Sequence, residues 1–141
     1  MSRDFLIDFG STNVKCALYC TETSSCLSTY AIPFPERLSN PDPAIHEVDP
    51  AEIRRCLFHA LSNIPLSSLQ GILISAQMHG YLLADGNGRL LTPYISWRDA
   101  RAGKALQNGS CLDVFLRENP GILWQEWGTL PKVNLPLISL Y

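Results

Sequence analysis

The sequence lacks the features that mark nucleic-acid and membrane partners. It has 141 residues with 11 Lys or Arg against 13 Asp or Glu and no basic run, so nucleic acid is not an expected partner. The longest mostly apolar stretch, residues 71–84, contains Gln77 and His79 and is shorter than a membrane span. The N-terminus has neither the long apolar stretch nor the cleavage site of a secretory signal. We therefore expect a cytoplasmic protein that does not bind membranes.

Cysteine pairs with metal-binding spacing are also absent. The chain has five Cys, which is an odd number, and they form no Cys-x-x-Cys motif. No His lies at a ligand spacing from any of them. This pattern argues against a disulfide framework and against a zinc site. We expect reduced thiols that serve mostly as small core residues.

The composition that is present is typical of one globular domain. Hydrophobic residues make up 46% of the chain and the formal net charge is −2, which argues against disorder. A compact chain of this length buries roughly 68–70% of the surface that its unfolded form exposes. No internal repeat and no low-complexity segment interrupts it. A hydrophobic core is therefore expected without metals or disulfides.

The first part of the sequence predicts strands. A short apolar run at 5–7, a polar turn at 8–13 and an alternating run at 14–20 predict a β-hairpin. Residues 27–35 predict a third strand that the prolines at its end terminate. Residues 41–49 predict a loop.

A helix is predicted next, and it has a clear beginning. Asp49 can cap it, Pro50 suits the first helical position and Glu52 can complete a capping box. The helix is expected to end before Pro65. Its apolar stripe follows helical spacing and consists of Ile53, Cys56, Leu57, Ala60 and Leu61.

The rest of the chain alternates between strand and helix patterns. Residues 71–75 predict a buried strand of the parallel-sheet kind, and residues 81–95 predict a hairpin around the turn 85–88. Asp99 can cap a helix that stops at 108–109, and Ser110 with Asp113 can open another that ends at 119–121. This order predicts an α/β fold with a mixed sheet. The chain ends in an apolar segment, which we interpret as part of a longer protein.

The turn after the first strand carries a candidate phosphate site. Asp8 can hold a hydrated Mg²⁺, and Gly10 permits a close approach of the backbone. Ser11 and Thr12 can donate to phosphate oxygens, and Lys15 follows on the return strand. The spacing matches neither a Walker A loop nor a dinucleotide fingerprint. A plain hairpin turn remains an alternative, because these residue types also favour turns.

Two further segments carry side chains suited to hydroxyl-rich ligands. Gln77 and His79 follow a buried strand, at the sheet edge where open α/β folds bind ligands. Trp97 offers a flat apolar face and Asp99 an acceptor, a pairing that suits a sugar ring. The alternatives are a His that bonds to the backbone, and a core Trp followed by a helix cap.

Taken in order, these motifs resemble those of a known enzyme family. Residues 5–15 (FLIDFGSTNVK) resemble the first phosphate motif of the actin, Hsp70 and sugar-kinase superfamily. Residues 77–80 (QMHG), an Asp-Gly-x-Gly-Arg hairpin, Pro93 and the Trp-x-Asp-x-Arg motif at 97–101 are similar to the FGGY carbohydrate kinases. Within that family they look most like the xylulokinase branch. The matches span nearly all of the chain.

The resemblance implies a fold and a domain organisation. His-Glu-Val-Asp-Pro at 46–50 and the Pro-Lys segment at 128–132 are similar to further family motifs. The implied fold is an incomplete ribonuclease H-like N-terminal domain with a mixed sheet and flanking helices. Residues 1–141 would form this partial domain, with the phosphate motif at 5–20 and sugar-site segments at 75–101. The C-terminal nucleotide-binding domain, and the Asp that serves as general base, would lie outside this chain.

The resemblance also implies ATP-dependent phosphorylation of a sugar hydroxyl, with a ketose as substrate and Mg²⁺ as cofactor. Asp8 would act on Mg²⁺ through water and on the phosphates. The ATP phosphate turn would consist of Gly10, Ser11, Thr12 and Lys15. The sugar site would consist of Gln77, Met78, His79, Trp97 and Asp99.

Two alternatives to the kinase interpretation remain open at the level of sequence. One is a truncated module that binds sugar without performing chemistry. The other is a regulatory or interaction remnant that pairs with another chain, for which a homodimer is the simplest form. An apolar tail and an open sheet edge would favour such pairing.

Overall fold

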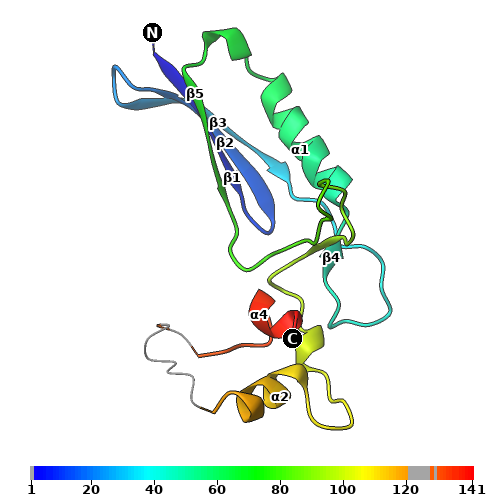
Figure 1. The fold of residues 1–141 in the computed structure, drawn as a ribbon. Coiled ribbons are helices and arrows are strands. Elements are labelled where there is room, and N and C mark those ends of the chain that lie inside the picture. Colours follow the sequence, from blue (N-terminus) through cyan, green and yellow to red (C-terminus); the bar gives the residue numbers. More distant parts are fainter. Residues whose placement is uncertain (1, 121–127, 129) are drawn as a thin grey trace. The chain divides into compact units, whose positions relative to one another are not determined.

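The computed structural model describes residues 2–120, 128 and 130–141 (Figure 1). Thr129, in the segment 128–132 that resembles a family motif, lies outside them. The chain divides into two compact units. Unit 1 comprises Met1–Glu36 and Asp49–Gln77, and unit 2 comprises Arg37–Val48 and Met78–Tyr141.

Unit 1 is built on a four-stranded sheet, and the prediction of a mixed sheet is confirmed. The strands lie in the order β3-β2-β1-β5, and β2 is antiparallel to both β1 and β3. β5 is parallel to β1. The connection from β3 to β5 passes through helix α1, which allows the chain to return parallel to β1. The bounds are β1 (Arg3–Phe9), β2 (Asn13–Cys20), β3 (Ser25–Pro33) and β5 (Gly71–Ala76).

Helix α1 (Pro50–Ser62) begins where its sequence signals predict. An Asp49 side-chain oxygen accepts a hydrogen bond from the Ala51 amide at 2.8 Å, and Pro50 occupies the first turn. Glu52, expected to complete a capping box, instead pairs with Arg55 at 2.5 Å. A short 3₁₀ helix, η1 (Leu66–Ser68), follows before β5.

The core of unit 1 lies between the sheet and α1, which runs along one face of the sheet (Figure 1). Alternation along the strands sends one set of side chains to that face, where Ala60 of α1 meets them. The Tyr30 hydroxyl donates to the Ala60 carbonyl at 2.6 Å, and burial of the phenol raises the pKa of Tyr30 to about 12. The buried strand residues are Phe5, Ile7, Val14 and Cys16.

β5 is less buried than its sequence predicts. Its apolar residues Ile72, Leu73 and Ile74 are 43%, 55% and 57% exposed. The prediction of a parallel strand is confirmed, but the prediction of burial is wrong. The reason is position: β5 is the edge strand, and β1 is its one neighbour in the sheet. The apolar composition of this segment predicts a parallel strand, but it does not indicate which strand lies at the edge of the sheet.

Unit 2 has a smaller antiparallel sheet of β4 (Glu47–Val48) and β6 (Tyr94–Ile95). The prediction that 41–49 is a loop is therefore wrong at its end, because tertiary pairing with β6 makes 47–48 a strand. The predicted turn at 85–88 is confirmed by a bond from the Gly88 amide to the Asp85 carbonyl at 3.0 Å. The flanking segments pair through isolated bridges rather than continuous strands.

The helices of unit 2 follow the sequence only in part. α2 (Cys111–Glu118) has the predicted capping box between Ser110 and Asp113. The prediction of a helix from Asp99 to 108–109 is wrong: a short 3₁₀ helix, η2 (Arg101–Gly103), stands there, and the Asp99 carboxylate binds the Arg101 amide and also the His46 amide of another segment. A further short helix, α4 (Pro136–Ser139), was not predicted. Ala102, Phe115 and Ile138 form the small core that these helices share.

All five cysteines are free thiols, as expected. Cys16 and Cys20 are buried, Cys56 and Cys111 are half-buried, and Cys26 is exposed. Within the described ranges, no helix combines the length and the apolar character that crossing a membrane requires.

Candidate functional site

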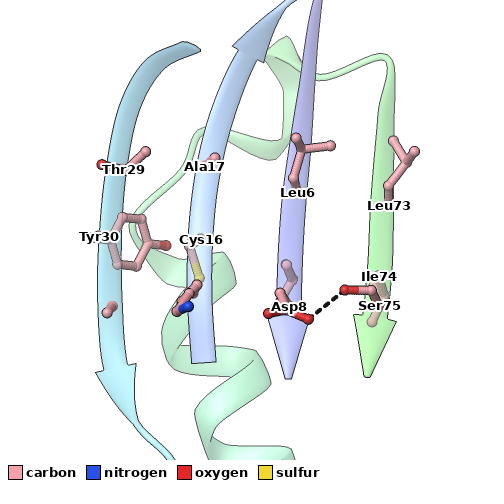
Figure 2. A pocket seen from close by; sticks show the side chains of 12 residues that line it. Leu6, Asp8, Cys16, Ala17, Thr29, Tyr30, Leu73, Ile74 and Ser75 are labelled. Atoms are coloured by element: carbon pink, nitrogen blue, oxygen red, sulfur yellow. Dashed lines mark hydrogen bonds between the residues drawn. The ribbon is translucent and has the colours of Figure 1, made fainter. Parts of the chain in front are cut away.

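The predicted phosphate residue Asp8 lies near the carboxyl end of β1, between two neighbouring strands. Lys15 of β2 is its antiparallel partner and Ser75 of β5 is its parallel partner. The Ser75 hydroxyl donates to Asp8 Oδ1 at 2.6 Å (Figure 2). The Asp8 side chain is otherwise exposed, so the carboxylate is held by one hydrogen bond and still faces solvent.

The turn between β1 and β2 is closed by its own backbone. The Gly10 amide donates to the carbonyl oxygens of Asp8 and Asn13, each at 3.1 Å. A Cβ at Gly10 would lie 2.9 Å from the Asn13 oxygen, so a larger residue would push the turn open. The Phe34 amide donates to the Thr12 carbonyl at 2.9 Å, which fixes the turn to the end of β3 and leaves the Thr12 side chain exposed.

Gln77 connects the end of β5 to the end of β1. Its amide donates to the Phe9 carbonyl at 2.9 Å, which continues the parallel ladder by one bond. Its side-chain oxygen Oε1 is buried and has no hydrogen-bond partner among the described residues. A buried carbonyl oxygen without a donor is costly and marks a position where an added hydroxyl would be favourable.

A cavity of about 760 Å³ lies over the sheet of unit 1 (Figure 2). The side chains of Leu6, Ala17 and Leu73 give part of its wall an apolar character without hydrogen-bonding groups. Polar chemistry gathers where the cavity meets Asp8, Lys15 and Ser75. Thr29 and Tyr30 add further polar groups to the lining, from β3.

The residues around Asp8 suit a hydrated Mg²⁺ and a phosphate chain. An exposed carboxylate, nearby hydroxyls and a Lys ammonium are the groups that such a ligand needs. In the part of the chain that the structure describes, no group of three or more His, Cys, Asp or Glu could hold a metal ion by itself. Mg²⁺ at Asp8 would therefore complete its coordination with water and phosphate oxygens, as it commonly does in nucleotide sites.

The sugar residues predicted in unit 2 lie on adjoining segments. The Tyr81 amide donates to the Ile95 carbonyl at 2.9 Å, and the Ile95 amide donates back to Tyr81 at 2.7 Å. Counted outward from this antiparallel bridge, His79 and Trp97 occupy corresponding positions on the two segments. Gly80 lies against the Tyr94 ring, which a Cβ there would overlap. This bridge therefore joins the segment that carries His79 to the segment that carries Trp97.

The side chains at these positions are available to a ligand. Met78 is 75% exposed and Trp97 is 38% exposed. The guanidinium of Arg98 lies 5.7 Å from the Trp97 ring centroid, within range of a cation–π interaction. His79 has φ = 65°, a conformation uncommon for a non-glycine residue and concentrated at functional sites.

Asp99 differs from the other predicted sugar residues because its carboxylate is 1% exposed. Oδ1 accepts from the Arg101 amide at 3.0 Å and from Arg101 Nε at 2.8 Å. Oδ2 accepts from the His46 amide at 2.8 Å and from Arg101 Nη2 at 2.7 Å. Arg101 Nη2 also donates to Glu47 at 2.6 Å. These bonds use the acceptor sites that a sugar hydroxyl would need.

The ionisation of this group follows from its contacts. Burial acts to raise the pKa of Asp99, but the hydrogen bonds from Arg101 and from the His46 amide outweigh it and hold the pKa below its usual value. The same contacts raise the pKa of Arg101. Asp99 and Arg101 are therefore a permanently charged pair at neutral pH.

Sequence reasoning did not assign roles to three residues of these sites. Ser75, Glu47 and Arg101 stand within the motifs that were noted, but their functions depend on pairing between distant segments. The parallel register of β5 with β1 puts Ser75 beside Asp8, and such a register is not visible in a sequence. The pairing of β4 with β6 brings Glu47 within reach of Arg101 in the same way.

Comparisons with known proteins identify the family of this chain. Residues 5–134 match the model of the FGGY family of carbohydrate kinases, N-terminal domain. Gluconokinase of Bacillus subtilis is 32% identical over 100 residues, which is 68% of this chain and 19% of that protein. Apulose kinase of Pectobacterium atrosepticum is 33% identical over 106 residues, 72% of this chain and 21% of that protein.

A solved structure gives the same result for the fold. The crystal structure of a xyloylose kinase from Brucella ovis matches with a TM-score of 0.76 and 25% identity, over 95% of this chain and 27% of that one. The chain thus spans about a fifth of the length of the curated relatives it matches. Its mixed sheet is that of the actin and Hsp70-like sugar kinases, and the chain belongs to the FGGY family of carbohydrate kinases.

Proposed function

We propose that this chain forms the nucleotide-phosphate and sugar-contacting first part of a kinase that transfers phosphate from ATP to a sugar hydroxyl. One observation carries the proposal: Asp8 is held by Ser75 at the carboxyl ends of the parallel strands β1 and β5, beside a glycine turn. Open α/β sheets bind ligands at this edge.

The phosphate end is assigned from the contacts of its groups. Asp8 holds Mg²⁺ through water, and the Ser11 and Thr12 hydroxyls and the Lys15 ammonium contact phosphate oxygens. The Gly10 amide is used within the turn, so glycine serves here to keep the turn tight. Bound Mg²⁺ supplies neutralisation of the charge that spreads over the phosphoryl oxygens during transfer.

The sugar end is assigned from exposure and unmet hydrogen bonds. Trp97 offers an apolar ring to the sugar, and Met78 and His79 contact it from the adjoining segment. The buried Gln77 oxygen accepts from a sugar hydroxyl. We propose a ketose as the substrate, since the similar apulose and xyloylose kinases are named for ketoses, with a sugar acid such as gluconate as the competing class.

Transfer also needs a general base beside the attacking hydroxyl. We place this base, and the adenosine site, in the part of the kinase that lies beyond this chain, since the match covers only 19% and 21% of the two curated relatives. The chain by itself is therefore expected to be inactive.

The test is an ADP-release assay on the full-length protein that carries this chain. The panel contains ketoses, aldoses and aldonates, each with MgATP, and the 141-residue chain serves as the comparison. We expect sugar-dependent ADP release from the full-length protein, largest with a ketose, and none from the chain alone. ADP release from the chain alone would contradict the fragment assignment, and release only with aldonates would contradict the ketose assignment.

A further inference from the structure

We propose that Asp99, Arg101 and Glu47, here called the Asp99 cluster, act as positioning residues that hold Trp97 in place in the candidate sugar site. The inference rests on the proposed sugar-kinase function. It gives Asp99 a role behind the sugar site in place of a direct contact with the sugar.

The first argument is that the Asp99 carboxylate points inward. An ionised carboxylate offers about four acceptor sites. The His46 amide, the Arg101 amide, Arg101 Nε and Arg101 Nη2 fill four of them. With 1% of the residue exposed, no further donor can reach Asp99 without displacing one of these bonds.

The second argument is that the cluster fixes the turn that carries Trp97. The Asp99 amide donates to the Ser96 carbonyl at 2.9 Å, so Trp97 and Arg98 occupy the two central positions of a β-turn. Both ends of this turn are bound to the segment before β4. The Ser96 amide donates to the His46 carbonyl at 3.0 Å, and the Asp99 carboxylate accepts from the His46 amide at 2.8 Å.

The third argument links the cluster to His79. Glu47, which accepts from Arg101, belongs to β4, and β4 pairs with β6 at Glu47 and Ile95. Ile95 in turn pairs with Tyr81, two positions after His79. The cluster therefore joins the two segments that carry the candidate sugar contacts.

The Asp99 cluster can fix the position of Trp97 because its hydrogen bonds are directional and charged. Arg101 presents a rigid planar fork, and it contacts Asp99 through Nε and Nη2 together, which fixes distance and angle. Loss of the Arg101 guanidinium would leave the charge of the buried Asp99 carboxylate without a compensating cation. A neutral hydrogen bond at this place would allow more movement.

The test uses the full-length protein with Asp99→Asn and Glu47→Gln, and with Glu52→Gln as the control. Glu52 forms an exposed ion pair with Arg55 in unit 1, so Glu52→Gln removes the same charge from a residue outside the Asp99 cluster. For Asp99→Asn we expect the sugar KM to rise about 10-fold or more, with the ATP KM and kcat changed less than about 3-fold, because ground-state sugar binding is lost. Glu47→Gln should raise the sugar KM by about 2- to 5-fold, since Asp99 and Arg101 stay paired.

A second readout does not depend on activity. Tryptophan is replaced by 5-fluorotryptophan, and the ¹⁹F resonance of Trp97 is assigned by its loss in Trp97→Phe. In Glu47→Gln and Asp99→Asn this resonance should shift or broaden, whereas the other resonances and the Glu52→Gln spectrum should not change. Arg101→Lys, which keeps the charge but not the fork, should give a smaller change than Arg101→Met.

The two readouts separate the two proposals. If the wild-type protein shows no sugar-dependent activity, the proposed function fails, and the ¹⁹F spectra still decide whether the cluster holds Trp97. If the Asp99→Asn protein does not fold, the Glu47→Gln and Arg101→Lys spectra and KM values decide instead. An unchanged Trp97 resonance with an unchanged sugar KM in the folded variants would overturn the inference. A fall in kcat without a rise in sugar KM would overturn it as well.

Discussion

At the scale of single residues, the sites depend on whether each polar group has a partner. Asp8 keeps an exposed carboxylate with one internal hydrogen bond, whereas Asp99 has its acceptor sites filled and is buried. Both are acidic residues in family motifs, and the sequence does not separate them. The hydrogen bonds show that Asp8 has the accessible carboxylate of the two, which suits it to a ligand.

His46 gives a prediction about pH. Burial, and then the positive charge of Arg98, lower the pKa of His46, and its buried Nδ1 has no hydrogen-bond partner among the described residues. The folded state therefore favours the neutral ring, while the unfolded chain protonates His near its ordinary pKa of about 6.5. Below that pH the unfolded state binds more protons, so the free energy of unfolding must fall as pH falls.

The measurement is the melting temperature between about pH 7.5 and 5, for the wild type and for His46→Gln. We expect the wild-type melting temperature to drop in this window and the drop to be smaller in His46→Gln. The depressed pKa of Asp99 acts at lower pH, because its stabilisation is lost only as the carboxylate becomes protonated. Parallel curves for the two proteins would show that His46 titrates normally.

At the scale of secondary-structure elements, α1 allows a measurement of how much its N-terminal cap contributes to the free energy of unfolding. Asp49 caps the helix through the Ala51 amide at 2.8 Å. Asp49→Ala should lower the free energy of unfolding by about 1 kcal/mol, the usual cost of losing such a cap. Chemical denaturation measures this change.

Glu52→Gln is the control for that measurement. It removes an exposed ion pair of α1 while leaving the cap intact, and exposed pairs contribute about 0.2–1 kcal/mol at most. A loss in Asp49→Ala no larger than the loss in Glu52→Gln would mean that the cap does not determine where α1 begins.

The elements that the sequence predicted correctly are those with local causes. The hairpin of β1 and β2, the start of α1 and the capping box of α2 each depend on residues close together in the chain. The failures have distant causes. Residues 47–48 form a strand because β6 pairs with them, and the carboxylate of Asp99, expected only as a helix cap or a sugar contact, also binds the distant His46 amide. β5 is exposed because it lies at the sheet edge.

At the scale of the whole molecule, the proposed roles divide between the two units. Unit 1 holds the phosphate residues and Gln77, and unit 2 holds Met78, His79, Trp97 and the Asp99 cluster. The sequence motifs identified the family because they occur in the family's order along nearly all of the chain. The match of residues 5–134 to the family model confirms this prediction. The motifs do not identify the sugar, because sugar recognition depends on all the side chains of the complete site.

The central claim is that Asp8 serves phosphoryl transfer from ATP to a sugar. The most direct test compares Asp8→Asn with wild type in the full-length protein, with Asp4→Asn as the control because Asp4 lies on the same face of β1 toward its other end. The measurement is kcat for sugar-dependent ADP release. We predict a fall of at least about 100-fold for Asp8→Asn, the scale of losing one electrostatic contact to the transferring group, and little change for Asp4→Asn. Wild-type turnover in a folded Asp8→Asn protein would contradict the account.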